Sequence, residues 1–311
     1  MFPGVQENLF FEDISMKIYE DKIIQILDNW GLNEAVITPV EQDCQTAWDI
    51  NGIYVLKKFR NAEDLSSCTN FSKQLSLHKI PVVEFIETKN GSLSPPGDLY
   101  CLMTKLPGVH VNFYEKPELA NEMGRGLALL HNALSDIEEY TDCNDSKLID
   151  DWCNQIKPSL NNVPEDIITA IDKELKETYP KLPRQLIHRD FHPRNVLFEG
   201  DHISGWLDFD LSHRNIRIFD IAYFLAGLII GNIGDPVKIN IWHEIRRNLI
   251  QGYNEINPLS DNEISAIPAI MIVIEFLFVW YWSKQNNSNE RDIALDVAMW
   301  LWCEIFEDEG S

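Results

Sequence analysis

The chain has 311 residues, of which 45% are hydrophobic, enough to bury one large core or two smaller ones. Its formal net charge is −23, from 49 acidic and 26 basic side chains. Such a surface repels nucleic-acid phosphates and attracts small cationic ligands, so we expect no nucleic-acid partner. The alternative is that the acidity only keeps the protein in solution.

Cysteine usage and the chain start indicate the compartment. The 6 cysteines are scattered, and no two form a C-x-x-C pair, as is typical of buried thiols in a reducing cytosol. The opening MFPGVQENLFFEDIS lacks the basic and long apolar regions of a secretory signal, so we expect a cytoplasmic protein. The most apolar stretch, Ile264–Trp282, contains Pro268 and Glu275, which favours a buried core helix over a membrane span. No membrane partner is therefore expected.

The first hundred residues predict a small antiparallel sheet with one helix, preceded by a leading helix. Apolar residues at helical spacing place the leading helix from about Tyr19 to Trp30, where Gly31 ends it. Asn51-Gly52 is a strong hairpin signal, and a polar helical stretch runs from about Ala62 to His78. The expected strands are Ala35–Val40, Gln45–Ile50, Ile53–Phe59, Val82–Thr88 and Leu99–Thr104.

The pattern changes after Pro107-Gly108. Leu119–Leu134 is helical, Asp136–Pro183 is acidic and mostly helical, and Gln185–Phe209 reads as loop and short strands. From about Ile221 the chain is nearly all helix. We therefore expect an α+β chain with a small lobe over residues 1–106 and a helical lobe over residues 107–311. Nucleotides often bind between such lobes.

The most informative run is HRDFHPRNVLFEGDHISGWLDFD, residues 188–210. It contains the catalytic-loop pattern H-R-D-x-x-x-x-N, formed by His188, Arg189, Asp190 and Asn195. An apolar strand, a turn and a second strand follow Asn195. This hairpin would bring Asp208 back beside Asn195, so that an amide oxygen and a carboxylate lie together.

These residue types suit phosphoryl transfer. Mg²⁺ prefers oxygen ligands, and one carboxylate, one amide and phosphate oxygens satisfy it well. The reaction needs charge neutralisation and alignment more than covalent help. A separate carboxylate must take the proton of the acceptor hydroxyl, and Asp190 fits that role.

The same run resembles the aminoglycoside phosphotransferase family, whose relatives include choline and ethanolamine kinases, homoserine kinase type II and spore-coat kinase-like proteins. Weaker similarity lies in YVLKKF, CLMTKLPG and GLALLH, and the resemblance covers about Ala35 to Leu228. The specific stretches are LIHRDFHPRNVLF (Leu186–Phe198), GWLDFD (Gly205–Asp210) and RIFDIAYFL (Arg217–Leu225).

The resemblance implies a bilobal protein-kinase-like fold, with a small antiparallel-sheet N-lobe that binds ATP or GTP and a large helical C-lobe that holds the catalytic loop and the substrate. It makes Asp190 the catalytic base. It also makes Asn195 and Asp208 the Mg²⁺ ligands, and through the metal they bind the nucleotide. Asp220 is the acid that braces the catalytic loop, and Asp210 would touch a second metal or the substrate.

In the N-lobe, the resemblance makes Lys57 the strand lysine that holds the α- and β-phosphates. Lys58 is the rival, because neighbouring strand residues point to opposite faces. The backbone of Leu102–Lys105, which includes Met103 and Thr104, would pair with the purine base.

Three departures from the family pattern concern the packing of the catalytic loop and the handling of the nucleotide. Arg189 and Arg194 stand where many relatives have glycine, and the expected phosphate-covering loop, Glu41–Thr46, has none. Where kinases place a glutamate that pairs with the strand lysine, this chain has Ser66–Asn70, with Glu63 or Asp64 as substitutes. An alternative is therefore a nucleotide-binding scaffold without useful turnover. A protein kinase is disfavoured, because no A-P-E-type segment follows.

Two further points concern histidines and the acceptor. The spacing of His188 and His192 would suit zinc on a helix, but Pro193 and the missing H-E-x-x-H glutamate favour a role in bracing the loop. His131 is expected to be a packed helix residue. The acceptor is expected to be a small, amine-bearing alcohol held by acids of residues 136–151 and of the last helices. An aminoglycoside or another antibiotic, homoserine and a choline-like alcohol all stay open.

Overall fold

The computed structural model describes residues 22–40, 46–137 and 147–306. The chain forms two compact units, one of residues 1–73 and 82–106 and the other of residues 74–81 and 107–311. We call them the strand unit and the helical unit. Residues 74–81 belong to the helical unit, in which the Trp206 N–H donates to the Pro81 carbonyl at 2.8 Å.

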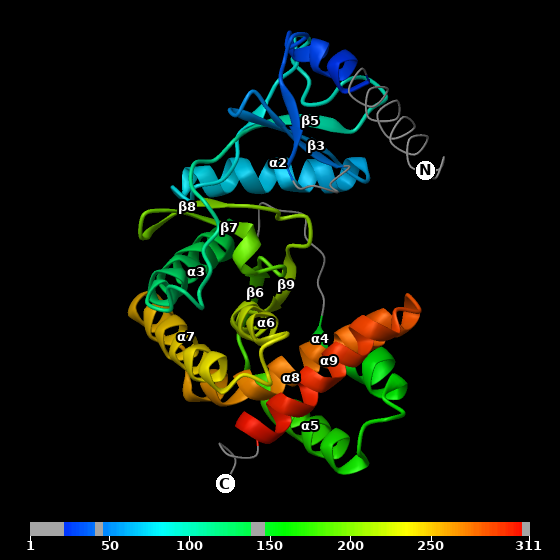
Figure 1. The fold of residues 1–311 in the computed structure, drawn as a ribbon, viewed down its shortest axis with the longest axis vertical. Coiled ribbons are helices and arrows are strands. Elements are labelled where there is room, and N and C mark those ends of the chain that lie inside the picture. The colour runs from blue at the N-terminus through cyan, green and yellow to red at the C-terminus, as the bar shows by residue number, and fades with distance from the viewer. Residues whose placement is uncertain (1–21, 41–45, 138–146, 307–311) are drawn as a thin grey trace, which may run out of the picture. The chain divides into compact units, whose positions relative to one another are not determined.

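The strand unit contains one antiparallel sheet with strand order β1-β2-β3-β5-β4 (Figure 1). The helical residues 22–27 and the 3₁₀ turn Asp28–Trp30 end at Gly31, which has a φ of 81°. They pack against one apolar cluster that includes Ile26, Leu27, Trp48 and Leu56. The strands are β1 Ile37–Pro39, β2 Ala47–Ile50, β3 Tyr54–Lys58, β4 Phe85–Ile86 and β5 Tyr100–Thr104.

The β2–β3 hairpin forms as its turn signal predicts. Asn51 and Gly52 both have positive φ, at 58° and 74°, as a two-residue turn of this hand requires. The Asp49 carboxylate accepts from the Gly52 N–H at 2.7 Å and closes the turn. A second cluster of Phe59, Cys68 and Cys101 joins the sheet to α2, Ala62–Leu77.

The helical unit is built around long helices, among which α3 lies alongside α7 (Figure 1). Glycines make this approach possible: a Cβ on Gly124 would collide with the Leu249 carbonyl oxygen, and one on Gly252 with the Asn121 carbonyl oxygen. The helices are α3 Leu119–Ile137, α4 Leu148–Asp151, α5 Glu165–Thr178, α6 Ile218–Ile229, α7 Pro236–Ile256, α8 Asp261–Lys284 and α9 Ser288–Leu301.

Two short antiparallel ladders complete the helical unit. Strand β6, Arg184–Ile187, pairs with β9, His213–Ile216. Strand β7, Val196–Glu199, pairs with β8, His202–Trp206. The fold is therefore α+β with an antiparallel five-stranded sheet and a helical majority, as the sequence predicts.

Helix α8 is the most apolar element of the helical unit. Within the described residues it is the one helix long and apolar enough to cross a membrane, but 67% of its most apolar window is buried. It starts with a capping box in which Ser260 and Glu263 satisfy each other's backbone N–H groups. The interior Pro268 and Glu275 are both buried, so α8 packs as a core helix.

Candidate active site

The β7–β8 hairpin brings Asn195 and Asp208 together at its open end. Asn195 closes a single 3₁₀ turn, Pro193–Asn195, and its carbonyl accepts from the Leu207 N–H at 2.9 Å. Val196 pairs with Trp206, so Asp208 follows β8 by two residues. The predicted hairpin is confirmed, and the left-handed φ of 59° at Asp208 turns the chain there.

Asp190 is held by hydrogen bonds from two sides. The Tyr223 hydroxyl donates to Oδ1 at 2.9 Å, and the Asn195 side-chain amide donates to Oδ2 at 3.2 Å. The His192 Nε2 lies 3.6 Å from Oδ2, and the Asp190 side chain is 23% exposed. Burial alone would raise the pKa of Asp190, but His192 and then the Tyr223 hydroxyl outweigh it and lower the pKa to about 2. Asp190 is therefore ionised and oriented at neutral pH.

The Asn195 side chain has an oxygen to spare for a metal. Its amide nitrogen donates both to the Asp190 carbonyl at 2.8 Å and to the Asp190 carboxylate. Among the described residues no bond is made to its Oδ1. An amide oxygen beside the exposed Asp208 is a donor set that suits Mg²⁺, so the residues fit the expected metal.

Asp220, fully buried at the start of α6, ties down the backbone that carries Asp190. Its Oδ2 accepts from the His188 N–H at 2.9 Å and its Oδ1 from the Arg189 N–H at 2.8 Å. His131 Nε2 lies 3.0 Å from the same Oδ2. A buried carboxylate with three donors is well compensated and holds their geometry.

His131 has more than the packing role that the sequence predicts. It is fully buried on α3, and both ring nitrogens have partners, Asp220 at Nε2 and the Tyr253 hydroxyl at 2.8 Å from Nδ1. The available signal was a histidine on the apolar face of GLALLH, where a buried imidazole must find hydrogen-bond partners. The partners themselves come from distant parts of the chain.

Arg189 adopts φ of 74°, a left-handed conformation that glycine accepts most easily. This explains why the related pattern has glycine at that position. Its guanidinium lies over the Phe219 ring at 4.7 Å and donates to His213 Nε2 at 3.2 Å. Burial, followed by the Arg189 charge, lowers the pKa of His213 to about 4, so His213 is a neutral acceptor.

The loop histidines hold backbone rather than forming a zinc pair. His188 Nε2 bonds the Leu207 carbonyl at 2.8 Å, and its ring packs on Phe209 at 4.7 Å. His192 Nδ1 accepts from the Arg194 N–H at 3.2 Å. No group of three or more metal-binding His, Cys, Asp or Glu side chains occurs within residues 22–40, 46–137 and 147–306. Asp210, half-buried, follows Phe209.

On β3 of the strand unit, Lys57 and Lys58 point to opposite faces, as strand geometry requires. The Lys57 ammonium lies 5.0 Å from the Phe59 ring centre, and the Lys58 ammonium lies 5.6 Å from that of Tyr100. Lys57 is half-buried and Lys58 exposed. Asp64, a suggested partner for Lys57, instead pairs with Arg60 at 3.4 Å and bonds Asn61.

The segment expected to meet the purine base has used most of its backbone donors. Met103 lies within the sheet between Val55 and Phe85. The Thr104 N–H donates to the Glu84 carbonyl at 2.9 Å and the Lys105 N–H to the Ile53 carbonyl at 3.0 Å. Those two N–H groups are not available to a base.

The next residue supplies the open donor. Among the described residues the Leu106 N–H has no acceptor, and Pro107 has no N–H. The Lys105 side chain is also engaged, because its ammonium lies 2.6 Å from the Asp49 carboxylate. The Leu106 N–H is therefore an open backbone donor directly after the segment that the sequence predicts to meet the base.

Some expected features lie outside the described residues. Most of the phosphate-covering loop, residues 41–45, belongs to that group, as do residues 138–146 of the acidic stretch. Ser66–Asn70, where kinases have the lysine-pairing glutamate, lies within α2.

The fold and the catalytic loop define a kinase-like phosphotransferase. The profile of the phosphotransferase enzyme family (APH) matches residues 45–258, and the chain belongs to that family. A homoserine kinase of Phenylobacterium zucineum is 28% identical over 229 residues, 70% of this chain. The chain spans 67% of that relative's length and 56% of the next three.

Solved structures support the fold. A choline/ethanolamine kinase family protein from Mesorhizobium loti superposes with a TM-score of 0.69 at 12% identity, over 93% of this chain and 97% of that one. The GDP and kanamycin complex of APH(2")-IIia superposes with a TM-score of 0.68 at 12% identity, over 92% and 100% of the two chains. At such identities the likeness concerns the fold.

Proposed function

We propose that this protein transfers the γ-phosphoryl group of ATP or GTP to a hydroxyl of a small, amine-bearing molecule. The observation that carries the proposal is the Asp190 carboxylate, ionised and held by Tyr223 and Asn195 next to the expected metal ligands. Few structural roles need an oriented, partly exposed carboxylate beside a second carboxylate and an amide oxygen.

Asp190 acts mainly by orientation. A carboxylate with a pKa of about 2 is a weak base, so it accepts a hydrogen bond from the acceptor hydroxyl and takes the proton as the new P–O bond forms. Asn195 and Asp208 would hold Mg²⁺, which supplies charge neutralisation between the phosphates. Asp210 is a further candidate ligand, and Asp220 positions the loop.

The strand unit contributes the nucleotide contacts in this proposal. Lys57 holds the α- and β-phosphates, and the Leu106 N–H donates to the base, with Met103, Thr104 and Lys105 forming the adjoining backbone. This placement is supported by the half-buried position of Lys57 and by the donors already used at Thr104 and Lys105.

An amine on the acceptor is supported by the net charge of −23 and by the names of similar proteins. Homoserine, ethanolamine, choline and kanamycin are alcohols that carry amino or ammonium groups. The scattered cysteines, with no C-x-x-C pair, support a cytoplasmic location.

The test is a screen for nucleotide consumption with Mg²⁺ and ATP or GTP over those four alcohols, with glycerol as the amine-free control. We expect turnover on one amine-bearing alcohol. Asp190→Asn should lose about 10²–10⁴-fold in kcat yet keep the nucleotide-dependent rise in Tm. Asp208→Asn should lose that rise. Full turnover by Asp190→Asn would contradict the assignment, and binding without turnover on any alcohol would favour the scaffold alternative.

A further inference from the structure

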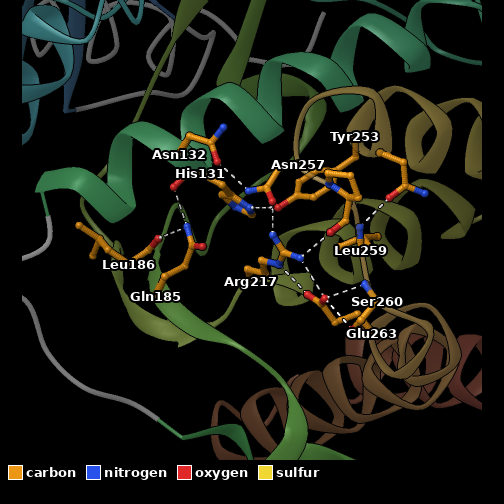
Figure 2. Close-up of polar contacts among 12 residues, drawn as sticks. His131, Asn132, Gln185, Leu186, Arg217, Tyr253, Asn257, Leu259, Ser260 and Glu263 are labelled. Atoms are coloured by element: carbon orange, nitrogen blue, oxygen red, sulfur yellow. Dashed lines mark hydrogen bonds and ion pairs between the residues drawn. The ribbon is translucent and has the colours of Figure 1, made fainter.

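The brace on the catalytic loop continues beyond His131 into a buried chain of side chains. Figure 2 shows His131 of α3 facing Tyr253 of α7, with Arg217 and Glu263 close by. His131 and Tyr253 are fully buried, and Arg217 and Glu263 are 9% and 2% exposed. The Arg217 guanidinium lies 5.8 Å from the centre of the Tyr253 ring. Polar groups this deep in a core must be matched donor to acceptor.

The donors and acceptors around each side chain determine where the protons lie in this buried row. Asp220 receives two backbone N–H groups, so it is an acceptor and His131 Nε2 must carry the proton between them. Burial raises the pKa of the Tyr253 phenol, which therefore keeps its proton. Arg217 has only donors. In the described part of the chain, the one acceptor left for the phenol is His131 Nδ1.

Arg217 is itself rigidly held. Its Nε and Nη2 donate to the two Glu263 oxygens at 2.6 and 2.9 Å, and Nη2 also donates to the Pro258 carbonyl at 3.0 Å. Its Nη1 donates to Asn257 Oδ1 at 2.6 Å. These four bonds leave one of the five guanidinium N–H groups, and a hydrogen bond joins the Arg217 and Tyr253 side chains. Because Arg217 can only donate, the Tyr253 oxygen accepts there and its own proton must go elsewhere.

We propose that Tyr253 is a positioning residue: its hydroxyl keeps His131 neutral with the proton on Nε2, and His131 then holds Asp220 and the His188–Arg189 backbone that aims Asp190. The inference rests on the role proposed for Asp190. It assigns a function to a side chain on α7 that has no contact with the reacting atoms.

The kinetic test compares Tyr253→Phe with Tyr114→Phe. Each change removes one hydroxyl, and Tyr114 donates only to the α6 end, at the Leu228 carbonyl, 2.7 Å away. We expect Tyr253→Phe to lower kcat by about tenfold, because a misplaced base loses alignment, with both KM values within about twofold. Tyr114→Phe should leave kcat unchanged.

Two readouts do not depend on turnover. Amide exchange at His188 and Arg189 should accelerate in Tyr253→Phe but not in Tyr114→Phe, since those N–H groups are the ones that Asp220 holds. In ¹⁵N-histidine spectra, His131, identified by its loss in His131→Gln, should show the neutral Nε2–H form. The ¹⁵N chemical shifts of the two His131 ring nitrogens should change in Tyr253→Phe.

A second variant distinguishes a positioning role of Tyr253 from a general loss of stability. In His131→Gln the new side chain can still donate to Asp220 and does not need Tyr253 to do so. Adding Tyr253→Phe to His131→Gln should therefore have no further effect on kcat. Additive losses would overturn the proposal, as would an unchanged His131 spectrum or unchanged amide exchange in Tyr253→Phe. If the wild type fails to turn over, the proposed function fails, while the spectra and the exchange still decide the role of Tyr253.

Discussion

Polar groups are used differently in the two units. In the helical unit, the Asp220 carboxylate is fully buried and receives three donors, two of them backbone N–H groups of the catalytic loop and the third His131 of α3. In the strand unit, the Asp49 carboxylate is 19% exposed and its partner Lys105 is 46% exposed. The catalytic loop is thus held by buried groups that water does not reach, whereas the charged pair of the strand unit is open to water. The base contact proposed for the strand unit would use one backbone donor, at Leu106. Three predictions test this difference.

The largest effect is expected for Asp220→Ala. It would leave two backbone N–H groups and the His131 ring buried without an acceptor, which costs about 3–5 kcal/mol of unfolding free energy. Turnover should fall together with stability, because the Asp190 backbone loses its anchor. Urea unfolding measures the change, and Asp49→Ala in the strand unit is the matched control, with an expected loss under about 1 kcal/mol. Equal losses in the two variants would remove the distinction between the units.

The next effect is a pH dependence of the unfolding free energy that arises from Glu275. Its Oε1 is the one buried carboxyl oxygen without a hydrogen-bond partner among the described residues. Burial raises its pKa to about 8. Because the folded state binds this proton more tightly, the stabilisation is fully present below the ordinary glutamate pKa and is lost as the pH rises through about 8. Glu275→Gln should therefore match the wild type near pH 4.5 and exceed it by roughly 3–5 kcal/mol near pH 9.

Thermal unfolding across that pH range gives the measurement for Glu275. The control is Glu177→Gln, at an exposed position of α5, which changes the same chemical group without a buried carboxyl and should alter stability by less than about 0.5 kcal/mol. A difference in unfolding free energy between Glu275→Gln and the wild type that does not change with pH would mean that folding does not shift the pKa of this carboxyl.

The smallest effect concerns the base contact in the strand unit. Leu106→Pro removes the open N–H and should weaken nucleotide binding by about tenfold, the value of one hydrogen bond. Lys105→Ala removes the exposed pair with Asp49 but no backbone donor, so nucleotide affinity should stay unchanged and stability should fall by less than about 1 kcal/mol. Titration calorimetry compares the two, and an unchanged nucleotide affinity in Leu106→Pro would contradict the base contact at Leu106.

The sequence by itself determined the local features of this protein. The Asn51-Gly52 turn, the β7–β8 hairpin and the neighbouring Asn195 and Asp208 follow from turn chemistry and strand alternation over short stretches. The order Asp190, Asn195, Asp208 within one run was enough to indicate phosphoryl transfer. Helix α8 was recognisable as a core helix by its interior Pro268 and Glu275.

The tertiary structure alone decided which distant groups pair. His131 and Asp220 lie 89 positions apart, and His131 and Tyr253 lie 122 apart, so no local pattern connects them. Glycines on α3 and α7 bring those helices close enough for the contacts to form. The acceptors of the Thr104 and Lys105 N–H groups, the carbonyls of Glu84 and Ile53, are likewise visible only in the folded chain. Propensity describes what a segment prefers, whereas the partner of a buried polar group is chosen by packing, which depends on the whole chain.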